Sequence, residues 1–216
     1  MSLTLYYHPL SSFCHKALIA LYETDTPFEK RMVNLGDPDD RAAFKKLWPI
    51  GKFPVLRDDA RGRTIPESTI IIEYLAEHYP GRVSLVPKDE DAARDVRASD
   101  RFFDLYVHMP MQTVVGDRLR PADQKDPFGV EAARTTIRTA LDMIEPDMAR
   151  KTWAVGEAFT LADCAAAPAL FFADKVVPFG DSHKNVTAYL TRLMARPSYA
   201  RALEEAEPYF KFFPQE

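Results

Sequence analysis

The stretch from Leu3 to Leu21 constrains the fold most, because it reads as a strand that leads directly into a helix. The apolar and aromatic residues from Leu3 to Tyr7 predict a short buried strand. His8-Pro9-Leu10 ends this run, and apolar side chains then recur at the spacing of one helical face, at Phe13, Ala17, Ala20 and Leu21. The intervening turn therefore brings Ser11 and Ser12 to the first turn of the helix.

A helix N-terminus that follows a strand in this way is suited to binding an anion. Its first backbone N–H groups have no acceptor within the helix, and the helix dipole is positive at this end. A thiolate is stabilised in such a place. Serines that precede helices also act as simple N-caps, so Ser11 and Ser12 keep two interpretations at this point, as caps or as part of a thiolate site.

The charge balance of the chain argues against partners that need a strongly charged surface. The 216 residues carry 28 Lys and Arg against 32 Asp and Glu, a net charge of −4, and 46% are hydrophobic. This composition is that of a soluble globular protein and predicts neither nucleic acid nor an anionic membrane as a partner. No apolar run approaches the roughly 18 residues of a membrane-spanning helix, and we expect no signal peptide.

The cysteines and histidines indicate a reducing compartment and no metal. The two cysteines, Cys14 and Cys164, lie far apart in the sequence. This favours free thiols in the cytoplasm over a disulfide framework. The five histidines show no metal-ligand spacing, so we expect no metal cofactor.

The pattern of predicted elements divides the chain into two domains. Strand and helix signals alternate over residues 1–80, which predicts a compact α/β domain. Residues 81–88 read as a linker, and residues 89–216 show only helical periodicity. Within this all-helical domain we expect a helix from about Glu90 to Leu119, bent near Pro110, and a loop from Pro121 to Gly129.

Two short motifs in the first domain have chemical interpretations. Phe53-Pro54 precedes a strand, and a cis bond there would turn the backbone of Phe53 toward an extended peptide-like ligand. A trans proline at a strand start is the commoner arrangement. Glu67-Ser68 opens a helix. There the pair could bind the ammonium and carboxylate of an amino-acid head group. Alternatively, Ser68 caps the helix and the positive end of the helix dipole stabilises Glu67.

The order and spacing of these motifs resemble the cytosolic glutathione transferase family, of the bacterial type. The resemblance covers the strand–serine–helix opening, GKFPVL, PES at a helix start and the helical second half. FTLADCA also matches the family's capping box, with Thr160 as the cap and Asp163 at N3, and ARPSYARAL is similar to its closing helices. The resemblance implies a thioredoxin-like first domain followed by an all-α domain.

The resemblance also implies glutathione as co-substrate, bound in the first domain. Glu67 and Ser68 would take the γ-glutamyl end, Phe53 and Pro54 the cysteinyl backbone, and Lys52 the glycyl carboxylate. A serine-type active site places Ser11 at the position that activates the thiol, with Ser12 and Tyr7 as alternatives. Cys14 stands at the second cysteine position of a thioredoxin-like pair, and we expect it to be mainly a packing residue.

A hydrophobic acceptor pocket would then lie between the two domains. Its candidate residues are aromatic and methionine side chains of the helical domain, namely Phe103, Tyr106, Met111 and Phe210. The function implied is conjugation of the glutathione thiolate to hydrophobic electrophiles, with glutathione-dependent peroxide reduction as a further activity. The alternatives are a glutathione-dependent lyase, isomerase or dehalogenase, or a non-catalytic binding module. A homodimer is expected.

Overall fold

The opening strand and helix are both present, and the strand lies inside a four-stranded sheet. The computed structural model describes residues 2–215. Strand β1 (Leu3–Tyr7) pairs in parallel with β2 (Glu29–Met32) and antiparallel with β3 (Val55–Asp58), which forms a hairpin with β4 (Arg63–Pro66). The strand order is β2-β1-β3-β4, so β1 is a central strand, as its apolar run predicts.

Helices cover both faces of this sheet. They are α1 (Ser12–Glu23), α2 (Pro38–Leu47) and α3 (Ser68–His78). Leu5 of β1 is fully buried in the large core that α1 and α3 contribute to. Tyr6, which points to the opposite face, stacks on Phe44 of α2 with ring centroids 6.1 Å apart. The alternation of side chains along β1 thus separates two hydrophobic clusters.

The register of the strands brings three loops to one end of the sheet. Tyr6 near the end of β1 is opposite Val55 at the start of β3, and Val55 is opposite Pro66 at the end of β4. Three connections therefore meet at this end of the sheet: the turn after β1, the loop before β3 and the connection from β4 to α3. The Phe53-Pro54 bond in the middle loop is cis, whereas the frequency of X–Pro isomers alone favoured trans.

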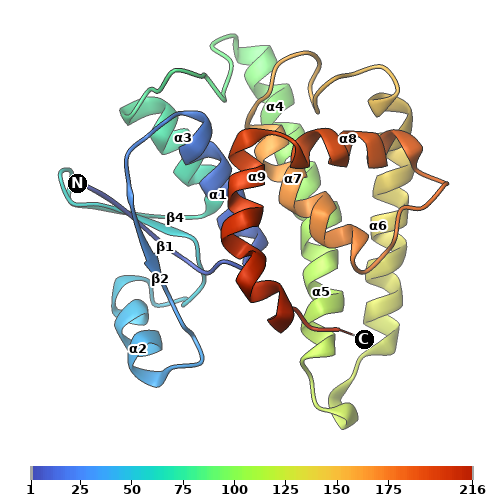
Figure 1. Ribbon diagram of the computed structural model, residues 1–216, viewed down its shortest axis with the longest axis horizontal. Coiled ribbons are helices and arrows are strands. Elements are labelled where there is room, and N and C mark those ends of the chain that lie inside the picture. Colours follow the sequence, from blue (N-terminus) through green and yellow to red (C-terminus); the bar gives the residue numbers. More distant parts are fainter. Residues whose placement is uncertain (1, 216) are drawn as a thin grey trace.

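After the linker, every named secondary-structure element in the part of the chain that the structure describes is helical (Figure 1). The elements are α4 (Glu90–Phe102), a π-helical segment η1 (Phe103–His108), α5 (Met109–Arg118), the short η2 (Ala122–Gln124), α6 (Pro127–Met148), α7 (Leu161–Asp174), α8 (Lys184–Met194), α9 (Pro197–Ala206) and η3 (Glu207–Phe212). None of the helices among residues 2–215 is long and apolar enough to cross a membrane.

One of two local expectations for the helical domain was wrong. The helix expected from about Glu90 to Leu119 is a continuous helical run to Arg118, formed by α4, the π-helical segment η1 and α5, and η1 lies directly ahead of Pro110. The loop expected to reach Gly129 ends earlier, because the side chain of Asp126 accepts from the backbone N–H of Gly129 and caps α6.

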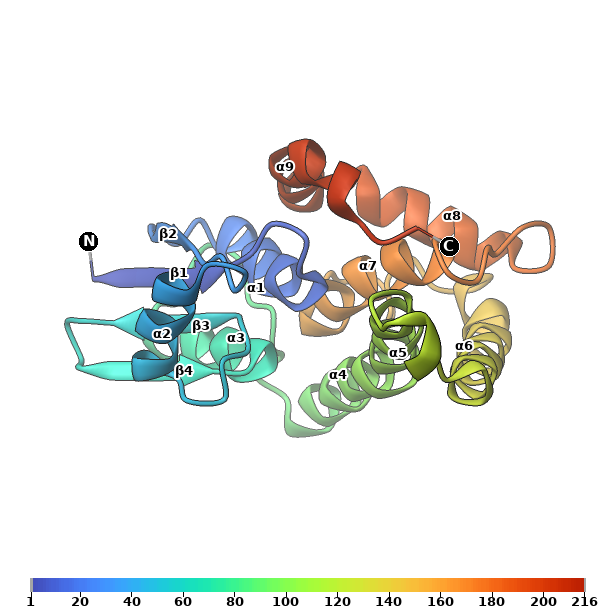
Figure 2. The same cartoon turned by 90° about the horizontal axis from the view of Figure 1, so that it is seen from below.

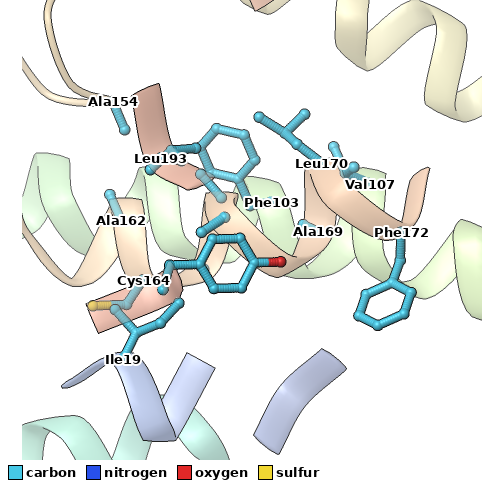
Figure 3. Packing of buried hydrophobic residues seen from close by; sticks show 14 of the residues in the cluster. Ile19, Phe103, Val107, Ala154, Ala162, Cys164, Ala169, Leu170, Phe172 and Leu193 are labelled. Carbon is cyan, nitrogen blue, oxygen red and sulfur yellow. The ribbon is translucent and has the colours of Figure 1, made fainter. Parts of the chain in front are cut away.

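Helix α1 joins the two halves of the molecule. Figure 2 shows α1 between the sheet and helices α7 and α9. Six alanines make the sequence of α7 rich in small side chains, which allows α1 to approach closely. Ile19 of α1 lies beside Cys164 of α7 in this contact (Figure 3), and both are fully buried.

The predicted capping box at the start of α7 is present. The side chain of Thr160 accepts from the N–H of Ala162, and the carboxylate of Asp163 accepts from the N–H of Thr160 at 2.8 Å. Asp163 also accepts from the N–H of Ala154 and from the hydroxyl of Tyr189. The box therefore anchors α7 to two neighbouring segments, in addition to capping the helix.

Candidate active site

A pocket of about 280 Å³ opens between the two halves of the chain, in front of α1. The α/β half contributes Leu10, Ser11, Ser12 and Phe53. Helix α5 and its C-cap residue contribute one stripe at helical spacing, namely Met111, Gln112, Val115, Gly116 and Leu119. Phe172 and Phe213 complete the lining. The pocket thus joins the serines of the first turn to an almost entirely apolar wall.

Ser11 is the N-cap of α1, and capping leaves its hydroxyl proton free. Its Oγ accepts from the backbone N–H of Cys14 at 3.4 Å. Accepting uses a lone pair, so the O–H group can still donate to an anion in the pocket. The backbone N–H groups of Ser12 and Phe13 have no acceptor among the described residues and lie at the positive end of the helix dipole. Both interpretations of Ser11, cap and anion donor, are therefore compatible with one geometry.

Tyr7 and Ser12 differ from Ser11 in their surroundings. Tyr7 is not among the residues that line the pocket. Burial and the nearby carboxylate of Glu205 raise the pKa of Tyr7, so its phenol stays protonated. Ser12 lines the pocket but is 4% exposed, whereas Ser11 is partly exposed.

Cys14 lies behind the serines, fully buried in the helix. Burial raises the pKa of its thiol to about 12, although hydrogen bonding to Ser11 and to the backbone at His8 opposes this change. Burial likewise raises the pKa of Cys164. Both cysteines are thus held as thiols.

We expect neither cysteine to be alkylated in the native protein. At about pH 8, iodoacetamide should leave Cys14 and Cys164 unmodified, because only a thiolate reacts and both groups remain neutral and covered. The same treatment in strong denaturant should label both, and mass spectrometry counts the adducts. Rapid labelling of Cys14 in the native protein would contradict the packing role.

The raised thiol pKa of Cys14 also sets the sign of an alkaline pH dependence. The unfolded chain ionises near pH 9 and the folded chain near pH 12. The contribution of Cys14 to stability is therefore present below about pH 9 and is lost as the pH rises through this window.

The other predicted glutathione residues lie on the two neighbouring loops. Phe53 precedes the first paired residue of β3, so its backbone stays outside the ladder, while Pro54 is buried. Glu67 has φ +68°, a conformation that costs energy for a residue with a side chain. Glu67 directly precedes α3, whose N-terminus has no side-chain cap, so the first N–H groups of α3 are available to an anion.

Three of the predicted glutathione residues have polar groups without partners. Among the described residues, no hydrogen bond or ion pair involves the ammonium of Lys52, the carboxylate of Glu67 or the hydroxyl of Ser68. Lys52 and Glu67 are exposed, and Ser68 is 5% exposed. An amino-acid head group would supply the missing partners.

The four aromatic and methionine residues predicted for the acceptor pocket are not all brought together. Met111 lines the pocket beside the serines. Phe103 is 3% exposed and borders a different pocket, Tyr106 is 50% exposed on η1, and Phe210 packs against Phe171.

The pocket is completed by residues that were not predicted from the sequence. They are Leu10, Gln112, Val115, Gly116, Leu119 and Phe172. The spacing of 112, 115, 116 and 119 is that of one helical face, which is the one signal in the sequence that could have marked them. Phe213, in the aromatic-rich run 209–213, also lines the pocket.

The described residues contain no group of three or more histidine, cysteine, aspartate or glutamate side chains that could hold a metal ion.

Comparison with known proteins gives concordant results. The family profile for the glutathione S-transferase N-terminal domain matches residues 5–83, and the profile for the C-terminal domain matches residues 102–197. A glutathione S-transferase-like protein, LUC7, of Fusarium is 33% identical over 150 residues, covering 68% of this chain and 64% of the relative. A maleylpyruvate isomerase of Ralstonia is 31% identical over 164 residues, covering 73% and 76%. The crystal structure of a glutathione S-transferase from Methylobacillus flagellatus, with glutathione bound, has a TM-score of 0.84 at 25% identity and covers 93% of this chain and 98% of that one.

Proposed function

Because the chain belongs to the glutathione S-transferase family, we propose that it is a glutathione transferase that conjugates the glutathione thiolate to hydrophobic electrophiles. The observation that carries the proposal is the meeting of three loops at one end of the sheet, in front of a mainly apolar pocket. The structure with glutathione bound that resembles this chain supports glutathione as the co-substrate.

Each loop has a distinct task in binding glutathione. Ser68 and the N-terminus of α3 hold the γ-glutamyl carboxylate, and Glu67 accepts from its ammonium. The backbone of Phe53 pairs with that of the cysteinyl residue, and Pro54 shapes this loop. Lys52 pairs with the glycyl carboxylate. The cysteinyl sulfur then lies in front of α1.

Ser11 activates the thiol by stabilising its ionised form. Its hydroxyl donates to the thiolate, and the N-terminus of α1 adds the field of the helix dipole. Lowering a thiol pKa by about 2 units from about 8.5 corresponds to roughly 2.7 kcal/mol, which these two effects together can supply. The thiolate attacks the electrophilic carbon, a C–S bond forms, and a leaving group departs with its electron pair. Ser11 itself forms no bond.

Two experiments in sequence test the proposal. The purified protein should be retained on immobilised glutathione and eluted by free glutathione, and it should then conjugate glutathione to chlorodinitrobenzene faster than the uncatalysed reaction. Failure to bind glutathione would overturn the proposal. Binding without turnover would favour a non-catalytic module on the same fold, since fold alone does not fix function.

A glutathione-dependent isomerase is the second candidate, and the relative from Ralstonia favours it. A lyase, a dehalogenase or a glutathione-dependent peroxidase would use the same activated thiolate, and all of these differ in what the acceptor pocket admits. We place the protein in the cytoplasm, in keeping with its two free cysteines.

Glu67→Ala is expected to weaken glutathione binding far more than it weakens folding. Removal of the carboxylate leaves the γ-glutamyl ammonium without its partner, a loss of about 1.5–3 kcal/mol for a hydrogen bond to a charged group. Titration calorimetry measures the affinity and thermal unfolding measures the stability. Glu77→Ala, a change of another exposed acid on α3, is the matched control. Equal affinity of Glu67→Ala and the parent would remove Glu67 from the site.

We also propose that the protein is a homodimer. Exposed apolar side chains on α3, on η1 and at the start of α5 include Ile70, Leu105, Tyr106 and Met109, and a second copy could cover them. Sedimentation equilibrium at micromolar concentration should give about twice the monomer mass of 24.5 kDa. A mass of one chain would contradict the dimer.

A further inference from the structure

We propose that Gly116 and Gln112 of α5 set the acceptor specificity of this pocket, which admits an uncharged ring that carries one hydrogen-bonding oxygen. The proposal rests on the proposed function and names the acceptor class for the same site. We expect the pocket to bind neutral rings and to disfavour anionic acceptors.

Gly116 opens a recess in the wall opposite the serines. It lies inside α5, where glycine destabilises a helix relative to alanine. A Cβ added at Gly116 would meet nothing within 4 Å, so no close contact of neighbouring atoms requires a glycine here. The space in front of its backbone is part of the pocket that Ser11 and Phe53 also line. The missing side chain therefore widens the pocket across from the sulfur position.

Among the described residues that line the helical-domain wall, only Gln112 has a side-chain amide that can hydrogen-bond to the acceptor substrate. It lies one turn before Gly116, on the same face of α5. Its amide makes no hydrogen bond to the described residues. The amide N–H₂ can therefore donate to a nitro or carbonyl oxygen on a ring that occupies the recess.

The lining of the pocket disfavours a charged acceptor. None of its described lining residues is a lysine, arginine, histidine, aspartate or glutamate. A carboxylate brought into this wall would lose water and gain no opposite charge. We therefore expect the pocket to exclude dianionic acceptors, such as dicarboxylic acids.

The test measures binding of glutathione derivatives, so that it does not depend on turnover. The probes are glutathione, S-methylglutathione, S-benzylglutathione, S-(nitrobenzyl)glutathione and S-(carboxybenzyl)glutathione, titrated by calorimetry. The variants are Gly116→Ala, Gly116→Leu and Gln112→Leu. Thr113→Leu is the matched control, because Thr113 is exposed on the same helix but does not line the pocket.

We expect the parent to bind the nitrobenzyl derivative roughly 10-fold or more tighter than the carboxybenzyl derivative, because the carboxylate is desolvated without a partner.

Gly116→Leu should weaken nitrobenzyl binding by roughly 10-fold or more, since its side chain fills the recess, with Gly116→Ala intermediate. Gln112→Leu should weaken nitrobenzyl binding by roughly 2- to 12-fold relative to benzyl binding, the range of one hydrogen bond. Glutathione and S-methylglutathione should bind all variants alike, and Thr113→Leu should behave as the parent.

Unchanged nitrobenzyl affinity in Gly116→Leu would overturn the role of Gly116, and equal binding of the carboxybenzyl and nitrobenzyl derivatives would overturn the preference for uncharged rings. In either case normal glutathione binding would leave the proposed function standing. Absence of glutathione binding in the parent would instead overturn the proposed function, and the acceptor assignment with it.

Discussion

Ser11→Ala should reduce conjugation near neutral pH by roughly 10- to 100-fold, because the pKa of bound glutathione rises by about one to two units and less thiolate is present. The hydroxyl stabilises the ionised thiol and not the peptide, so the affinity for glutathione should barely change. Raising the pH should restore most of the rate, since at alkaline pH the thiol ionises without help. The pH profile of kcat/KM measures both the loss of rate near neutral pH and its recovery at alkaline pH.

Ser12→Ala and Tyr7→Phe are the matched controls for Ser11→Ala. Ser12 is almost fully covered, and the raised pKa of Tyr7, caused by burial and by Glu205, leaves its phenol neutral and outside the pocket lining. Both variants should therefore retain most of the activity. A large loss in Tyr7→Phe with none in Ser11→Ala would identify a tyrosine-type enzyme, in which Ser11 is only the cap of α1.

The second large effect is expected for stability, in a buried ion cluster where the two halves of the chain meet. Lys16 of α1 is fully buried and lies 2.6 Å from Asp100 and 2.8 Å from Asp104. The hydroxyl of Thr69 on α3 accepts from Lys16 and donates to Asp100. The cluster therefore connects α1, α3 and the segment from α4 to η1.

Lys16→Met should destabilise the fold by about 3–5 kcal/mol, because two buried carboxylates lose their buried counter-ion and only the exposed Arg101, 3.5 Å from Asp104, remains. Lys30→Met is the control: Lys30 pairs with Glu205 at the surface, 2.8 Å away and 32% exposed, and its loss should cost less than about 1 kcal/mol. Chemical denaturation measures both. Combining Lys16→Met with Asp100→Leu and Asp104→Asn should recover most of the loss, and an unstable triple variant would argue that the cost is one of shape and not of charge.

The pH dependence of Lys16→Met has a defined sign. Burial raises the pKa of Asp104, and Lys16 opposes that change, so removing Lys16 raises this pKa further. The folded variant then binds a proton more tightly than the unfolded chain does. The loss of stability should therefore be smaller at about pH 5 than at about pH 8.

The sequence predicted those features that depend on local pattern. These features are the strand from Leu3, the serines at the first turn of α1 and the Thr160 capping box. They follow from hydrophobic periodicity within a short run of residues and from capping chemistry, and the structure confirms them. The meeting of the loops around Ser11, Phe53 and Glu67 could be expected from the resemblance, and the strand register provides its physical basis.

Features that depend on contacts between distant segments could not be read in this way. Lys16 lies on a helix face, and a lysine is almost never fully buried unless it is paired. Its two carboxylate partners, Asp100 and Asp104, are more than 80 residues away. The cis bond at Phe53-Pro54 and the π-helical segment η1 lie in stretches whose residues are compatible with commoner geometries. Gln112 and Gly116 belong to the site because the fold brings α5 to the pocket in front of α1, and no local pattern shows this.

The measurement that tests the central claim most directly is the pH titration of the thiolate absorbance of glutathione bound to the parent protein. If the N-terminus of α1 and Ser11 stabilise the thiolate, the ultraviolet band should appear with a midpoint about 2 units below the free-thiol value of about 8.5. A midpoint at the free value, with glutathione bound, would show that this pocket does not activate the thiol and would contradict the account.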